Sequence, residues 1–109
     1  MQTTLTVFRK FNNGEVIALF PHVPSSNDGY ECLSYMHVGQ HGGADMLLTR
    51  ETKAVKPAEY RDLARELRRI GYKLKIGTRI PRNSLQVRRK QIKLENDFKF
   101  GRLAAVLNS

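Results

Sequence analysis

Four residues with metal-binding or nucleophilic side chains lie close together in the first half of the chain. They are spaced by five, four and four positions: Cys32, His37, His41 and Asp45. Zinc binds thiolate, imidazole and carboxylate groups, and two histidines four residues apart share one face of a helix. The glycines of the stretch GQHGGAD disfavour a helix here. We therefore predict a glycine-rich loop over residues 39–45 and no metal site, with His37 and His41 contacting a binding partner.

The sequence also lacks the patterns of an enzyme. A nucleophilic enzyme needs Ser, Cys or Thr beside a histidine that a third group orients, but Cys32 and Ser34 are only loosely spaced from His37. Asp62 and Glu66 lie among arginines on a predicted helix, where ion pairing is the simplest interpretation. The stretch GQHGG lacks the lysine and the following helix of a phosphate-binding loop. We predict no enzymatic activity and no cofactor.

Basic residues form the stronger candidate site. The net charge is +9, and it is uneven: residues 1–55 carry four Lys and Arg against five Asp and Glu, whereas residues 56–109 carry fifteen against five. Long cationic side chains of this kind contact phosphate groups, arginine bidentately. Together with the two histidines, the predicted binding residues are Arg65, Arg68, Arg69, Lys73, Lys75, Arg79, Arg82, Arg88, Arg89, Lys90 and Lys93.

We expect these cations to be contiguous in space and to bind nucleic acid or a nucleoprotein. A solvated basic surface, an acidic protein partner and an anionic lipid surface are the alternatives. The sequence contains no recognisable helix-turn-helix, zinc finger or aromatic platform for single strands, so it does not indicate sequence-specific readout.

Among the elements that carry these residues, the most clearly predicted is a helix over residues 57–71, PAEYRDLARELRRIG. Pro57 suits a first helical position, and Gly71 suits the left-handed residue after the end. An apolar stripe at helical spacing consists of Tyr60, Leu63, Ala64, Leu67 and Ile70. This amphipathic helix needs a sheet to pack on.

Strands are predicted around the helix. Residues 3–10 and 15–20 pair around Asn13-Gly14 in a type I′ turn, and residues 21–29 form a surface loop with a tight turn at Asp28-Gly29. Residues 30–38 carry apolar side chains on both faces, which indicates a central strand. Residues 46–50 form a short fourth strand or an extended connection, and residues 72–80 form a strand with a basic outer face.

The last part of the chain is more ambiguous. Asn83 can cap a basic helix over about residues 84–95. The alternation of apolar residues over 92–100 alternatively indicates a strand. We favour the helix, with Gly101 ending it before a short apolar element at residues 102–107.

Together these elements predict an α+β fold, with a mostly antiparallel sheet of about four strands and one amphipathic helix packed on it. Residues 1–81 form this domain, and residues 82–109 are a basic helical extension that packs on the domain or on a partner. Cys32, the single cysteine, is expected to be a buried strand residue in a reducing compartment. No apolar run suits a membrane span or a signal peptide, so we expect a cytoplasmic protein, and the oligomeric state stays open.

Three stretches resemble a known group of proteins: FRKFNNGEVIALFPHVP, SYMHVGQHGGAD and PAEYRDLARELRRIGYKLK. The group consists of small proteins of phages and mobile elements of gut bacteria, and the resemblance covers about residues 5–90. It implies similarity to anti-CRISPR inhibitors of the type II-A effector nuclease, and hence a non-enzymatic protein that binds the nuclease ribonucleoprotein or its guide or target nucleic acid in the bacterial host cell. It implies no particular binding residues.

The charge limits how such an inhibitor can act. A DNA mimic needs an acidic surface to occupy a positive nucleic-acid channel, and a net charge of +9 excludes that route. The alternative function is a sequence-nonspecific nucleic-acid-binding accessory protein of a phage or mobile element.

Overall fold

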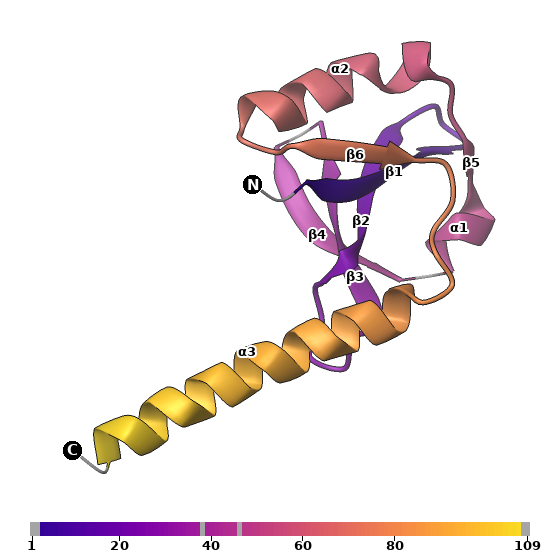
Figure 1. The fold of residues 1–109 in the computed structure, drawn as a ribbon. Helices are drawn as coiled ribbons and strands as arrows, with labels where there is room; N and C mark the ends of the chain where they lie inside the picture. The colour runs from indigo at the N-terminus through magenta and orange to yellow at the C-terminus, as the bar shows by residue number, and fades with distance from the viewer. Residues whose placement is uncertain (1–2, 38, 46, 108–109) are drawn as a thin grey trace.

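A computed structural model describes residues 3–37, 39–45 and 47–107, with residues 100–107 described by their backbone alone. The elements follow one another as β1 (Thr4–Phe11), β2 (Val16–Pro24), β3 (Glu31–Met36), β4 (Gln40–Asp45), α1 (Leu48–Glu51), β5 (Thr52–Ala54), α2 (Pro57–Arg69), β6 (Leu74–Gly77) and α3 (Ser84–Leu107). Figure 1 shows them as one sheet between α2 and the first turns of α3.

Within the described residues, six strands form the sheet in the order β4-β3-β2-β1-β5, with β6 beside the other end of β1. All pairs are antiparallel except β1 with β6, which is parallel. The predicted α+β class and the mostly antiparallel sheet are confirmed. The expected number of about four strands is too low, because β4 was predicted as a loop and no strand was predicted over β5. β6 lies within the strand predicted over residues 72–80 and is shorter than predicted.

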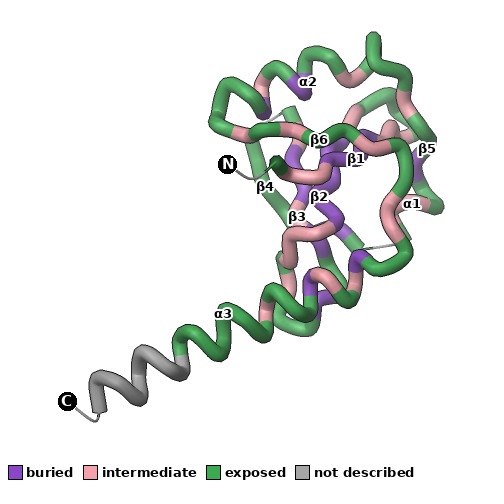
Figure 2. The backbone as a smooth tube through the Cα atoms, in the orientation of Figure 1, coloured by how far each residue is buried: buried purple, intermediate pink, exposed green. Residues whose placement is uncertain are grey.

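The sheet is buried on both faces. α2 covers one face with Leu63, Ala64 and Leu67, which pack against a cluster that includes Phe8 and Phe20. The opposite face contains a second cluster: Ile17, Leu19, Cys32 and Ala44, flanked by Leu48 and Ile80. Figure 2 shows the purple buried positions concentrated in the sheet and on the sides of α2 and α3 that meet it. β3 lies between β2 and β4, as its two apolar faces predicted.

Local signals set both ends of α2. The helix begins at Pro57, and the backbone N–H of Lys56 just before it donates to the Glu59 carboxylate at 3.3 Å. Gly71 follows the helix with φ +115°, as predicted. Ile70, however, is 50% exposed, because the helix ends one residue earlier and the chain turns toward β6. Its predicted place in the buried stripe is wrong.

The turn between β1 and β2 differs from the predicted type. Gly14 has φ +90°, whereas no described residue other than glycine has a positive φ, so a type I′ turn is excluded. The Gly14 N–H donates to the Phe11 carbonyl at 2.9 Å, and the Phe11 N–H donates to the Glu15 carbonyl at 2.9 Å. This is a three-residue hairpin loop that ends in a left-handed glycine.

The region predicted as a glycine-rich loop is strand β4. Gly42 and Gly43 pair with Ser34 and Leu33, and a Cβ on Gly43 would lie 2.1 Å from the Glu31 carboxylate. These glycines therefore let a partner strand and a carboxylate approach closely. α1 follows β4, where a strand or an extended connection was expected; Val38 and Met46 lie outside the described residues.

α3 begins at Ser84, as predicted, with a backbone bond from the Val87 N–H to the Asn83 carbonyl. Its predicted end near residue 95 is wrong, since the helix continues through Gly101 to Leu107. One glycine costs a helix about 1 kcal/mol, which the helix formers around it can offset. The first turns lie against the domain, and the rest of α3 projects away from it (Figure 1).

Gly29, in the β2–β3 turn, packs closely against α3. It is buried with φ +80°, and a Cβ there would lie 2.9 Å from Cγ of Arg89. Gly14 has a similar φ but open space around its Cα. We expect Gly14→Ala to cost about 1–2 kcal/mol of backbone strain. Gly29→Ala should cost about 1–3 kcal/mol more, because it also displaces α3.

Urea unfolding of the two variants measures this difference. Equal losses of stability in both variants would contradict the close contact between Gly29 and α3.

Candidate nucleic-acid interface

A buried arginine anchors α3 to the sheet. Arg88 is 1% exposed, and its Nε and Nη1 atoms donate hydrogen bonds of 2.7 Å each to the carbonyl oxygens of Gly29 and Pro21. One turn earlier, the buried Ser84 hydroxyl donates to the Pro81 carbonyl at 2.7 Å. Because the guanidinium points into the domain, the prediction that Arg88 contacts a partner is corrected: this residue holds the helix in place.

The neighbouring cations of α3 lie at the surface. Arg89, Lys90 and Lys93 are all exposed. The Arg89 guanidinium lies 4.9 Å from the ring centroid of Tyr30, and its Nε donates to the Asp28 carbonyl at 3.3 Å. A cation held over an exposed aromatic ring has a defined position at the surface.

Further predicted residues lie on β6 and in the connection to α3. Lys75 pairs with Leu5 of β1, and its positive charge acts on His22 of β2. Arg79 and Arg82 are exposed in the connection that leads to α3. We call the following residues the α3-side basic surface: Lys75, Arg79, Arg82, Arg89, Lys90 and Lys93.

The cations of α2 are separate. Arg65, Arg68 and Arg69 are exposed on a helix that lies on the other face of the sheet (Figure 1). Lys73 is exposed between α2 and β6, and its backbone carbonyl accepts from the Thr4 N–H at 2.7 Å. The expected contiguous set is therefore divided by the sheet, and a single flat partner cannot contact both parts.

His37 and His41 belong to a third cluster, at the β3–β4 hairpin and α2. His37 Nδ1 lies 3.4 Å from the Glu66 carboxylate, and His41 Nε2 is hydrogen-bonded to the Tyr72 hydroxyl at 2.8 Å. His41 also meets the Tyr35 ring edge-to-face at 4.8 Å. Burial raises the pKa of the Tyr35 phenol, and the Glu66 carboxylate raises that pKa further. Both histidines thus make contacts within the protein, away from the α3-side basic surface.

The residues that the structure describes contain no group of three or more His, Cys, Asp and Glu side chains able to hold a metal ion. Cys32 is fully buried with a free thiol, as predicted for a strand residue.

No family model, curated protein or solved structure matches this chain. None of the helices within the described ranges has an apolar stretch long enough to cross a bilayer.

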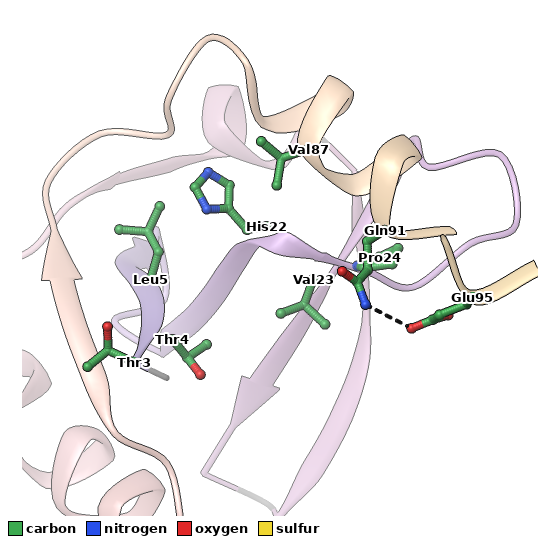
Figure 3. A pocket seen from close by; sticks show the side chains of 9 residues that line it. All are labelled: Thr3, Thr4, Leu5, His22, Val23, Pro24, Val87, Gln91 and Glu95. Atoms are coloured by element: carbon green, nitrogen blue, oxygen red, sulfur yellow. Dashed lines mark hydrogen bonds between the residues drawn. The ribbon is translucent and has the colours of Figure 1, made fainter. Parts of the chain in front are cut away.

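A groove that the sequence did not indicate lies beside the α3-side basic surface. It has a volume of about 410 Å³. Figure 3 shows it between α3 and the strand ends of β1 and β2, with side chains that include Thr4, Leu5, His22, Val87, Gln91 and Glu95. Ligand sites in proteins commonly have volumes of about 300–1,000 Å³.

His22 is the most unusual residue of this groove. Its Nε2 atom is buried and has no hydrogen-bond partner among the described residues. Burial lowers the pKa of His22, and the positive charges of Arg88 and Lys75 lower it further, so the ring is neutral near pH 7. The sequence missed this position, because the two prolines around His22 and Val23 indicated a surface loop, whereas β2 continues to Pro24.

The role of Arg88 as an anchor can be tested by substitution. Arg88→Ala should lower the free energy of unfolding by about 3 kcal/mol, because it leaves two carbonyl oxygens without their donors. Arg88→Lys should recover only part of this loss, since an ammonium lacks the planar fork that reaches both oxygens.

Lys90→Ala, on the same helix but exposed, is the matched control and should change stability by less than about 0.5 kcal/mol. Urea unfolding followed by circular dichroism measures all three variants, and an Arg88→Ala protein as stable as the control would refute the anchoring role.

Proposed function

We propose that this protein is a non-enzymatic nucleic-acid-binding protein that contacts phosphate groups through its α3-side basic surface. The observation that carries the proposal is the fixed first half of α3: Arg88 anchors the helix, and Arg89, Lys90 and Lys93 lie exposed beside it. A cationic surface held in place loses little entropy when it binds phosphates. The excess of fifteen Lys and Arg over five Asp and Glu in residues 56–109 attracts the same partner at long range.

Exposed aromatic rings favour single-stranded nucleic acid. Tyr30 is 58% exposed below the Arg89 guanidinium, and Phe98 of α3 is 66% exposed. Proteins that bind single strands without sequence preference combine a cationic track with rings on which bases stack. The described elements do not include a helix pair of the helix-turn-helix type, and this supports backbone contact over base readout in a major groove.

Inhibition of the type II-A effector nuclease is the second candidate. It rests on the resemblance of the stretch SYMHVGQHG, which corresponds to β3 and β4 and carries His37 and His41 at the surface. A basic inhibitor would contact the guide RNA, the target DNA or an acidic patch of the nuclease.

The first test measures binding of a short, fluorescently labelled single strand by anisotropy at several salt concentrations. Lys90→Ala combined with Lys93→Ala should weaken binding and reduce the slope of log affinity against log salt by about 1.4, because each lost phosphate contact removes about 0.7 from that slope. Arg65→Ala combined with Arg68→Ala is a matched control with the same charge change on the opposite face. Equal effects of the two double variants would contradict the assignment to the α3 side.

The second test distinguishes the two candidate functions. Purified protein is titrated into guide-loaded type II-A nuclease while cleavage of a target plasmid is followed, and bare DNA and guide RNA are examined for mobility shifts. Inhibition near stoichiometry without comparable binding to the bare nucleic acids would favour the inhibitor. Full cleavage together with a salt-sensitive shift would leave the nucleic-acid-binding accessory protein.

A further inference from the structure

The part of α3 that projects from the domain carries apolar side chains that the domain does not cover. We call residues 93–107 the projecting segment (Figure 1). Leu94 is 56% exposed and Phe98 is 66% exposed, and because they are four residues apart they share one side of the helix. Figure 2 shows exposed positions in green along the segment as far as its side chains are described. Most helices in proteins owe their stability to the packing of an apolar side, so this uncovered side indicates a docking surface.

A glycine continues the same side of the helix. Gly101 follows Leu94 by seven residues, which is close to two helical turns, and the backbone there is helical. Glycine is unfavourable inside a helix, but it allows another backbone to come close. Its position in line with Leu94 and Phe98 is therefore consistent with a second helix packed along this side.

Charged side chains flank the apolar side in a symmetric order. Residues 93–99 read KLENDFK, and all seven are exposed. The types of residue are the same in both directions from Asn96: acidic, apolar, then lysine. Glu95 and Lys99 lie on one flank of the apolar side, and Lys93 and Asp97 lie on the other, because the members of each pair are four residues apart. A two-fold dimer requires a surface that is complementary to itself, and this order provides one.

We propose that the projecting segment forms an antiparallel dimer with a second copy of the chain, centred on Asn96. Leu94 of each copy then packs against Phe98 of the other, and Gly101 lies opposite Gln91. This inference does not rest on the proposed function, because it concerns contacts between two copies of the protein alone.

The charges favour this pairing on both flanks. On one flank the two Glu95 carboxylates lie between the two Lys99 ammonium groups, and on the other the two Asp97 carboxylates lie between the two Lys93 groups. Each carboxylate is offset from a lysine of the second copy by two residues, or about 3 Å along the helix axis. The two carboxylates of a flank are equally close, but the attractive contacts outnumber this one repulsion.

The same charges favour a second copy over nucleic acid as the occupant. Residues 93–99 carry two lysines and two carboxylates and are neutral as a group. A polyanion gains little from a neutral segment, whereas a second copy matches both its apolar side and its charges. Lys93 is the one residue that the segment shares with the α3-side basic surface.

Analytical ultracentrifugation of the full chain, from micromolar to millimolar concentration and without nucleic acid, measures the association. The protein should shift from monomer to dimer over this range. Phe98→Ala should raise the dissociation constant about a hundredfold, because each dimer buries two of these rings. Ile70→Ala is the matched control: it also removes an exposed apolar side chain, at the end of α2, and should leave the dissociation constant unchanged.

An exchange of charges tests the pairing itself. One double variant combines Glu95→Lys with Asp97→Lys, and the other combines Lys93→Glu with Lys99→Glu. Each variant alone should stay monomeric, because both flanks then carry charges of a single sign. An equimolar mixture of the two should form a heterodimer that added salt weakens.

A protein that stays monomeric throughout the range would overturn the inference. A dimer that Phe98→Ala leaves intact, or a mixture of the charge variants that stays monomeric, would also overturn it. None of these outcomes bears on the proposed function, since no nucleic acid is present. Conversely, failure to bind a labelled single strand would overturn the proposed function and leave the dimer in place.

Discussion

The hydrogen bonds of Arg88 are the constraint on which the candidate site depends. A guanidinium that is removed from water loses hydration, and this loss is tolerable only when its donors find acceptors. Here the acceptors are the backbone carbonyls of Pro21, within β2, and Gly29, in the β2–β3 connection. The same bonds fix the rotation of α3 about its axis, and that rotation decides which side chains of the helix face the domain.

The consequences of this rotation follow from helical geometry. Residues four apart share a face, so Ser84 and Arg88 are buried while Lys90 and Lys93 point away. Arg89, one residue beyond the anchor, is directed to the β2–β3 turn and meets Tyr30. The buried Arg88 thus sets the orientation of α3, and this orientation decides which way the exposed cations of the helix face.

The sequence allowed prediction of those features that depend on neighbouring residues. Pro57, Gly71 and the apolar stripe between them were enough to place α2, because caps and helical periodicity are local. The start of α3 was predictable for the same reason. β4 was not predictable, since a segment containing Gly42 and Gly43 becomes a strand only when a distant partner supplies its hydrogen bonds. β6 was predicted as a strand, but its parallel pairing with β1 depends on residues about 70 positions away.

The residues of the candidate site likewise depend on distant parts of the chain, which the sequence does not reveal. Nothing near Arg88 in the sequence distinguishes it from Arg89, because the carbonyls that bind it are 59 and 67 positions away. The helical wheel of α3 could have identified one side as inward-facing, but only once a partner surface was known. His22 was missed for a related reason: the length of β2 depends on its pairing with β3, which shifts register between Phe20 and Pro24.

That register shift also accounts for the position of the groove. β2 pairs regularly with β3 up to Phe20 and resumes at Pro24, and in between Pro21 turns its carbonyl to Arg88 while His22 lies below α3. A regular strand would have continued the flat surface of the sheet and allowed the helix to pack closely along it. The irregularity instead leaves an imidazole nitrogen unpaired under the helix. The anchor and the groove thus arise from the same irregular stretch of β2.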